Sequence, residues 1–420
     1  MQPPQKIDNA PWLTAPPLQT IFSILNDQKE QARVVGGAVR NHFFNHPIHD
    51  IDIATKLPPK EILKRAENAG IKTIPTGIDH GTVTLVYQGQ SFEVTTLRRD
   101  IETDGRHAKV KFGTSWQEDA ARRDFTINAL YLSADGQLHD PLGTGWQDCS
   151  AKHVRFIGEP AARIKEDHLR ILRYYRFAAH YQQGPLDQAA ISATIQHRAG
   201  LSHLSKERIH SELIKLLTAE HLGPVISELY QNGLLLQILG AVPNIALFEK
   251  LIAIETNLNL APAPTVRLGI LAIHHHGDIK RLTKRLALSN REQTTLAESL
   301  STKPFERRTT NQPDEHTHKV YHYQMGREAY LTAFIASWAR SIHAPSSKPL
   351  QHLYQTASKW PELKFPITGK DLLAKGVQSG PKLGQTLAKL ERHWLANKMQ
   401  PSRSELLAHF MKKENKKREL

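Results

Sequence analysis

The pattern of secondary-structure signals changes once along this chain, near residue 158, and this change limits the folds that it can adopt. Before that point, short stretches rich in β-branched residues alternate with helical segments. After it, apolar residues recur at helical spacing almost to the end of the 420 residues. We therefore predict an α+β protein, in which a mixed β-sheet with a few covering helices precedes a long, all-helical part.

The local signals place most of the expected elements. In the first part, helices are predicted at 18–29, 39–44 and 59–69, and strands at 33–36, 50–55, 72–75, 82–87, 92–96, 126–133 and 154–157. In the second part, the main predicted helices are 161–181, 206–217, 224–231, 371–375 and 381–396. The polar segment 303–318 is predicted to be a hinge or an exposed loop.

The charge and the cysteine content of the chain indicate which kind of binding partner and which cellular compartment to expect. The chain has 55 Lys+Arg against 41 Asp+Glu, a formal net charge of +14, which favours a polyanionic partner such as nucleic acid. Cys149 is the only cysteine, so a disulfide framework and a thiolate metal site are excluded. We find no secretory signal and no run of about 18 apolar residues, and we expect a cytoplasmic protein without a membrane partner. The basic run 412–418 is expected to be a solvated tail.

Two neighbouring motifs indicate metal-assisted nucleotide chemistry. Gly36 and Gly37 precede a predicted helix, where free backbone N–H groups can approach a phosphate. Asp50 and Asp52 lie two residues apart on a predicted strand, so both side chains point to one face and can share divalent cations. We predict that they are catalytic and bind two Mg²⁺ ions. Glu93, on a later strand, is predicted as a third catalytic carboxylate, with a salt-bridged strand residue as its alternative.

Basic residues follow these carboxylates. Residues 98–112 form a polar stretch with several arginines and lysines, predicted to be a long loop that moves during turnover. Directly after it, Arg122 and Arg123 could clamp phosphates while Asp124 accepts a hydrogen bond from a ribose hydroxyl. The alternative is an ordinary salt bridge at a helix terminus.

The predicted helix 161–181 places Asp167 and Arg170 on one face, at i and i+3. A carboxylate can accept from an exocyclic amine while a guanidinium donates to the adjacent ring nitrogen. Cytosine and adenine match this pair, whereas uracil and guanine present the wrong groups. Each mismatched group that is buried would cost roughly 1–3 kcal/mol of binding free energy. We predict that the pair selects C and A without a template, with a solvated ion pair as the alternative.

The order of these motifs resembles the class II tRNA nucleotidyltransferase and bacterial poly(A) polymerase family. The resemblance rests on residues 36–40, 50–52, 122–124 with Asn128, 166–173 and 204–208. It implies a polymerase-beta-type nucleotidyltransferase head at 1–157, a neck with the base-recognition helix at 158–218, and an RNA-binding body and tail at 219–420. It also implies that the nucleotide is bound by Gly36, Gly37, Arg40, Arg122, Arg123, Asp124, Asn128, Asp167, Arg170 and Arg173. Asn41 departs from the family, which usually has aspartate after the arginine, and we expect a mild effect.

The resemblance further implies addition of CCA to the 3′ end of tRNA from CTP and ATP. Poly(A) polymerases carry a basic segment where this chain has residues 77–84, and members that add only part of CCA lack part of the loop that is full length here. Poly(A) synthesis and partial CC- or A-addition stay open as alternatives. An RNA-binding protein with a degenerate head is disfavoured because Asp50, Asp52 and Asp167 are present. A metal hydrolase centred on residues 274–278 is disfavoured because three adjacent histidines cannot all face one metal.

Overall fold

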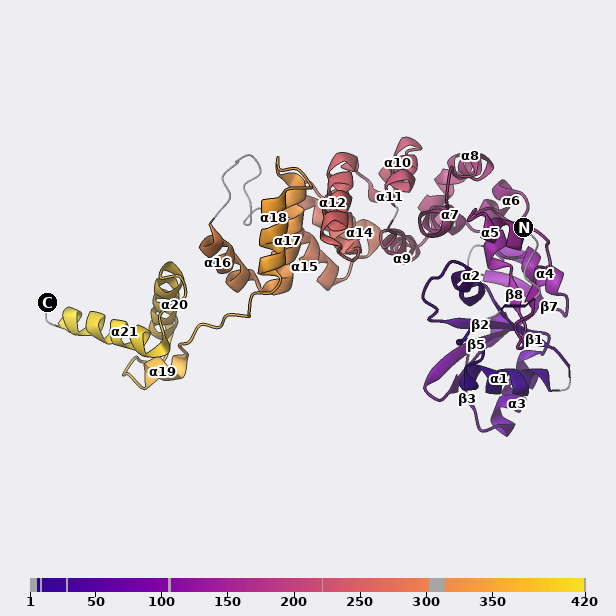
Figure 1. Cartoon of the computed structure of the whole chain (residues 1–420), viewed down its shortest axis with the longest axis horizontal. Helices are drawn as coiled ribbons and strands as arrows, with labels where there is room; N and C mark the ends of the chain where they lie inside the picture. The colour runs from indigo at the N-terminus through magenta and orange to yellow at the C-terminus, as the bar shows by residue number, and fades with distance from the viewer. Residues whose placement is uncertain are drawn as a thin grey trace. The chain divides into compact units, whose positions relative to one another are not determined.

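The computed structural model describes residues 6–7, 10–27, 29–104, 107–220, 222–301 and 314–418, without the side chains of residues 76, 99–111 and 413–418. The chain divides into two compact units. One unit comprises Met1–Pro243 and Lys284–Ala287, and the other comprises Asn244–Thr283 and Leu288–Leu420 (Figure 1). In the part of the chain that the structure describes, no helix is both long enough and apolar enough to cross a membrane.

The first unit contains a seven-stranded mixed sheet. Its strands are β1 (Ala32–Val35), β2 (Ile51–Thr55), β3 (Lys72–Gly77), β4 (Thr82–Tyr87), β5 (Gln90–Thr96), β8 (Tyr131–Leu132) and β9 (Leu138–His139). They lie in the order β3-β4-β5-β2-β1-β8-β9, and β2 and β5 run parallel while the other neighbours run antiparallel. The central position of β2 is what places its carboxylates beside β5.

Five helices cover this sheet: α1 (Pro16–Asn26), α2 (Gly37–Phe43), α3 (Pro59–Asn68), α4 (Trp116–Ala121) and α5 (Gly145–Ser150). Helices α1 and α3 contact each other and strands of the sheet (Figure 1). Beneath α4, Val35, Ala54 and Tyr131 belong to one buried apolar cluster. Val35, in this cluster, lies opposite Asp52 of β2, so the cluster packs beside one of the catalytic candidates.

After α5, the described part of the first unit continues as helices. It contains α6 (Pro160–Glu166), α7 (Leu169–Tyr181), α8 (Gln188–His197), α9 (Lys206–Leu216), α10 (Gly223–Gln231) and α11 (Leu234–Leu239). Helix α7 contacts α9 and α10, and its Tyr174 and Tyr175 are fully buried. The predicted α+β architecture with a helical continuation is confirmed.

From residue 245 onward, the described part of the chain forms only helices. They are α12 (Ile245–Leu258), α13 (Pro264–Ala272), α14 (His276–Leu286), α15 (Asn290–Ser299), α16 (Glu315–Met325), α17 (Arg327–Arg340), α18 (Lys348–Ala357), α19 (Gly369–Leu373), α20 (Pro381–Ala396) and α21 (Arg403–Arg418). Helices α19 to α21 have their own small core, which includes Leu372, Trp394 and Phe410. The C-terminal helices therefore do not rely on the head for their packing.

Three predictions of secondary structure are wrong. The helix predicted at 161–181 is two helices, because Asp167 has an extended backbone (φ −156°, ψ 108°) and its carboxylate accepts the N–H of Leu169. Residues 98–112 are a β-hairpin, β6 (Arg98–Asp104) and β7 (His107–Phe112), since facing backbone groups pair between Arg98 and Phe112 and between Asp104 and His107. Residues 105–106, including Gly105, a predicted flexible point, lie outside the described residues.

The third error concerns two short strands. Within the predicted strand 126–133, Thr126–Asn128 is a 3₁₀ turn and only β8 is extended. Residues 154–157 form no strand but a single bridge between Phe125 and Phe156. Of the predicted hinge 303–318, residues 303–313 lie outside the description, while Asp314 caps the start of α16 by accepting the N–H of Thr317 at 2.7 Å.

His318 is a buried titratable group in the second unit. Its side chain on α16 is completely buried, with Nδ1 3.0 Å from the Tyr330 hydroxyl and the ring 5.9 Å from that of Phe334. Burial lowers the pKa of His318 from 6.5 to about 4, because the charged imidazolium loses its hydration. The folded protein therefore binds this proton more weakly than the unfolded chain.

We predict that His318 makes the second unit acid-sensitive. Its contribution is constant above pH 6.5, and stability falls as the pH drops from about 6.5 to about 4, by roughly 3 kcal/mol at most. Thermal unfolding midpoints measured from pH 7.5 to 5 are expected to fall less steeply for His318→Gln than for the unchanged protein. The exposed His352→Gln is the control. Parallel pH profiles for His318→Gln and the unchanged protein would contradict the prediction.

Candidate active site

The three predicted catalytic carboxylates lie on one region of the sheet. Asp52 on β2 is directly opposite Glu93 on the parallel strand β5, and Asp50 is exposed immediately before β2. Burial raises the pKa of Asp52 above its ordinary value, and the negative charges of Glu93 and Asp50 raise it further. The positive charges of Arg123 and Arg40 lower this pKa but do not cancel the increase. The shift shows that these acidic groups lie near enough to repel one another, so a cation between them would relieve the repulsion.

The donor set is chemically suited to Mg²⁺, because hard divalent cations prefer carboxylate oxygens. Within the described residues, no group of three or more His, Cys, Asp or Glu side chains is already gathered closely enough to hold a metal ion. Metal binding by Asp50 and Asp52 therefore stays a prediction.

The glycine pair forms the turn between β1 and α2. Gly36 has φ 74°, a conformation that a residue with a side chain rarely adopts, and Gly37 is the first residue of α2. A Cβ on Gly36 would lie 3.5 Å from Nη1 of Arg123. The predicted phosphate-binding turn is thus adjacent to one of the two predicted phosphate-binding arginines.

Both of these arginines are held by a carboxylate that the sequence analysis missed. Asp119 on α4 is only 1% exposed and accepts from Arg122 Nε at 2.8 Å and from Arg123 Nη2 at 3.1 Å. It also accepts from the Tyr131 hydroxyl at 2.8 Å. Burial alone would raise the pKa of Asp119, but Arg123 and Arg122 bring it below its ordinary value. Asp119 is a positioning residue; its spacing of three and four from the arginines was the available signal.

Asp124 is engaged within the protein. One carboxylate oxygen accepts from the Asn128 amide at 2.9 Å and from the Phe125 N–H, and the other accepts from Arg173 Nε at 2.8 Å. Burial would raise the pKa of Asp124, but Arg173 and Asn128 lower it to about 2. The network joins the head to α7. The nucleotide contacts assigned to Asp124, Asn128 and Arg173 stay predictions.

Asp167 and Arg170 lie at the junction of α6 and α7 rather than on one continuous helix. The Arg170 N–H donates to the Asp167 carbonyl at 3.0 Å, so the junction still holds them together. Asp167 also accepts from Arg208 Nη2 of α9 at 2.7 Å. The Arg170 side chain donates to Glu166 and to the carbonyl of Arg163 at 3.0 Å. The predicted base-reading pair thus has two supporting partners, Arg208 and Glu166, to which the sequence analysis gave no role.

The histidine run before α14 has a structural explanation. Asp278 accepts the backbone N–H groups of His274 at 2.9 Å and His275 at 3.1 Å, and its side chain pairs with Arg281. These contacts close the start of the helix. Nothing in this arrangement supports the hydrolase alternative.

Comparison with sequence families separates the chain into three regions. Residues 32–155 match the family described as "Poly A polymerase head domain", residues 186–247 match "Probable RNA and SrmB-binding site of polymerase A", and residues 267–410 match tRNA nucleotidyltransferase domain 2. Together with the sheet and its carboxylates, these matches define a polymerase-beta-type nucleotidyltransferase with a helical continuation.

Individual relatives specify the family. The mitochondrial CCA tRNA nucleotidyltransferase 1 of Danio rerio is 35% identical over 401 residues, covering 92% of this chain and 89% of that protein. The CCA-adding enzyme of Levilactobacillus brevis is 31% identical over 403 residues, with 94% and 96% covered. The fold is similar to that of the Bacillus stearothermophilus CCA-adding enzyme solved with CTP, at a TM-score of 0.73, 24% identity, and 98% and 100% coverage. The chain belongs to the class II CCA-adding enzyme family, and such nucleotidyltransferases use divalent metal ions.

Gly200 packs closely against the junction of α6 and α7, which carries the predicted base-reading pair. A Cβ at this position would lie 1.8 Å from Cδ2 of His168, the residue between Asp167 and α7. Such an overlap cannot persist, so the imidazole and the backbone beside Asp167 would have to move.

We predict that Gly200→Ala lowers stability by roughly 1–3 kcal/mol and reduces the preference for CTP and ATP over UTP and GTP. Gly223→Ala is the matched control, because a Cβ there has nothing within 4 Å. Unfolding midpoints and incorporation of the four nucleotides measure the two effects. Unchanged selectivity in a destabilised Gly200→Ala protein would show that His168 does not position the pair.

Proposed function

We propose that this protein adds CCA to the 3′ end of tRNA from CTP and ATP, without a template, by two-metal nucleotidyl transfer. The terminal ribose hydroxyl of the RNA attacks the α-phosphorus of the nucleotide, and pyrophosphate leaves. The observation that carries the proposal is the 35% identity to a CCA tRNA nucleotidyltransferase across 92% of the chain. The chain retains the carboxylates, arginines and base-reading pair that this reaction requires.

The carboxylates would supply the metal site. Asp50 and Asp52 would hold Mg²⁺, with Glu93 beside Asp52 on the neighbouring strand. Bound Mg²⁺ would increase the acidity of the attacking hydroxyl and neutralise charge on the triphosphate. Glu93 would keep the Asp52 region strongly acidic and so favour a cation there.

The arginines and the helical junction would orient the nucleotide. Arg122 and Arg123, held by Asp119 beside the Gly36 turn, would donate to the phosphates. Asp167 would accept from the exocyclic amine of C or A through Oδ1, whose only protein partner in the described structure is the Leu169 N–H. Arg170 would donate to the adjacent ring nitrogen through Nε or Nη2, since its contacts with Glu166 and the Arg163 carbonyl use Nη1. Because Arg208 already holds Oδ2 of Asp167, the acceptor would stay in place.

The alternatives are separated by substrate use. The head-domain family includes poly(A) polymerases by name, so the head alone does not distinguish the two activities. The full-length relatives favour CCA addition. We place the enzyme in the cytoplasm, although several relatives are named as mitochondrial.

We predict that purified protein with Mg²⁺ adds two C residues and then one A to a labelled tRNA that ends before CCA, and then stops. CTP and ATP are offered singly and together, and products are resolved at single-nucleotide length. CTP alone is expected to give a +2 product. An open-ended ladder of A with ATP alone would instead assign poly(A) synthesis, and no extension with any nucleotide would favour an RNA-binding role.

We predict that Asp52→Asn lowers kcat by at least about 10²-fold, because it removes a charge that would hold the metal, while leaving tRNA binding within about twofold. Asp27→Asn is the control: Asp27 is exposed, and asparagine tolerates its positive φ. Single-turnover extension and a filter-binding assay separate the two quantities. Near-normal turnover in Asp52→Asn would remove Asp52 from the metal site.

A further inference from the structure

Tyr181, the last residue of α7, connects the helical neck to the phosphate-binding part of the head. Its hydroxyl accepts from Arg40 Nη2 at 2.9 Å and donates to Asn41 Oδ1 at 3.1 Å. Arg40 and Asn41 belong to α2, the helix that begins at Gly37. A single side chain of the neck therefore reaches the helix that follows the predicted phosphate-binding turn.

Arg40 is buried without a carboxylate against it in the described structure. The guanidinium is part of a residue only 8% exposed, and it donates to Asn128 Oδ1 at 2.5 Å, to Asn41 Oδ1 at 2.9 Å and to the Tyr181 hydroxyl. Its carbon lies 4.3 Å from the ring centre of Tyr181 and 4.9 Å from that of Phe177. Neutral oxygens and aromatic rings stabilise this charge, so the loss of one of these contacts is expected to destabilise the position of Arg40.

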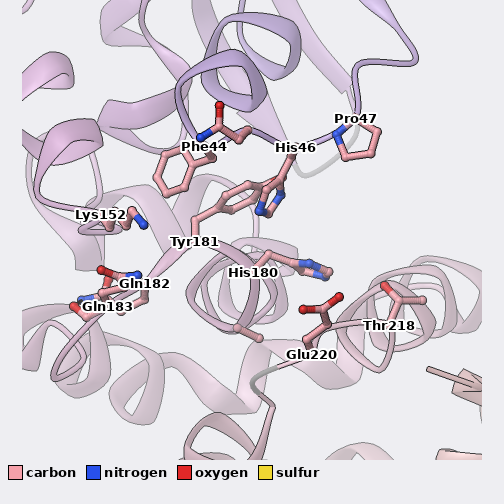
Figure 2. A pocket seen from close by; sticks show the side chains of 12 residues that line it. Phe44, His46, Pro47, Lys152, His180, Tyr181, Gln182, Gln183, Thr218 and Glu220 are labelled. Atoms are coloured by element: carbon pink, nitrogen blue, oxygen red, sulfur yellow. Dashed lines mark hydrogen bonds between the residues drawn. The ribbon is translucent and has the colours of Figure 1, made fainter. Parts of the chain in front are cut away.

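The ring of Tyr181 also contacts the loop that leads to the catalytic strand. It meets Phe44 edge-on at 5.1 Å between ring centres and lies 5.3 Å from the ring of His46. Figure 2 shows these rings together at the wall of a pocket of about 500 Å³. The Asn41 amide donates to the carbonyl of Pro47 at 2.8 Å, three residues before Asp50. The hydroxyl and the ring thus act on both segments that flank the catalytic site.

Helix α7 holds the two ends of the site in one rigid element. It starts beside Asp167 and Arg170 and ends at Tyr181, thirteen residues that span about 20 Å. Arg173 fixes it to Asp124 of the head near its start, and Tyr181 fixes it to Arg40 at its end. Together with apolar contacts such as that of Phe177 with Phe125, these two polar contacts define the orientation of α7 on the head.

We propose that Tyr181 is a positioning residue, which sets the phosphate-binding helix α2 and the loop before Asp50 relative to the base-reading junction. The inference rests on the proposed function and adds a role for a residue outside the predicted site. A nucleotide bound by its base at one end and by its triphosphate at the other requires a fixed separation of these elements. Tyr181 acts through Arg40, Asn41, Phe44 and His46 and touches no substrate.

The test compares Tyr181→Phe with Tyr175→Phe. Tyr175 is its matched control on the same helix, since it is buried and its hydroxyl bonds Thr194 of α8 at 3.0 Å, away from the head. Tyr181→Phe loses the bonds to Arg40 and Asn41, and Tyr175→Phe loses the bond to Thr194, so the unfolding midpoint is expected to decrease in both variants. For CTP and ATP addition, Tyr181→Phe is expected to lower kcat about 3- to 10-fold with KM within about twofold. Tyr175→Phe should keep kcat.

A second variant, Asn41→Ala, tests the same contact by another substitution. A second measurement, hydrogen exchange, does not depend on enzyme activity. Asn41→Ala removes the acceptor of the Tyr181 hydroxyl from the other side and is expected to reproduce the effect. Hydrogen exchange of the full chain should become faster in residues 41–50 in Tyr181→Phe and Asn41→Ala, but not in Tyr175→Phe. Equal exchange and equal kcat in all variants would overturn the inference. An inactive unchanged protein would contradict the proposed function, while the exchange experiment would still test Tyr181.

Discussion

The ion pair between the buried Asp124 and the partly exposed Arg173 is the contact on which the arrangement of this candidate active site depends. Asp124 belongs to the head and Arg173 to α7, and the same carboxylate also orders Asn128. Burying two charges costs much of what their attraction contributes, so such a pair defines geometry more than it adds stability. The Phe125 and Asn128 donors satisfy the carboxylate oxygen that Arg173 leaves free. Glu212 of α9 lies 3.8 Å from Arg173 and extends the network into the neck.

Many of the residues predicted to bind the nucleotide are likewise paired with other side chains of the protein. Arg122 and Arg123 share Asp119, Arg40 shares Asn128 with Asp124, and Arg170 pairs with Glu166. A basic site without substrate must limit repulsion among its own cations. Carboxylates beside the arginines do this while keeping each guanidinium within reach of the site. An incoming polyphosphate then replaces or joins partners that are already in place.

The sequence predicted the fold class and most of the sheet, because β4 and β5 carry the apolar alternation that one buried face requires and β1 is a short, mostly buried apolar run. It did not predict the break at Asp167, since helical periodicity continues through Ile164, Ile171 and Leu172 on both sides of the junction. The break comes from a local competition, in which the Asp167 carboxylate accepts the Leu169 N–H and pairs with the distant Arg208. Likewise, the pairing of β6 with β7 depends on backbone groups that charged side chains do not reveal.

The supporting residues were the harder part of the site to foresee. Asp50, Asp52, Arg122 and Arg123 are recognisable because their spacing itself suggests chemistry. Asp119, Tyr181 and Gly200 act by contacts with residues that are distant in sequence or on another turn of helix, and each is an unremarkable residue type in its own segment. In the proposed function, the placement of these residues matters all the same. A protein that selects C and A without a template must hold its own hydrogen-bonding groups as firmly as a template base would be held. In the proposed function, the extended backbone at Asp167, its bond from Arg208 and the absence of a Cβ at residue 200 would hold these groups in place.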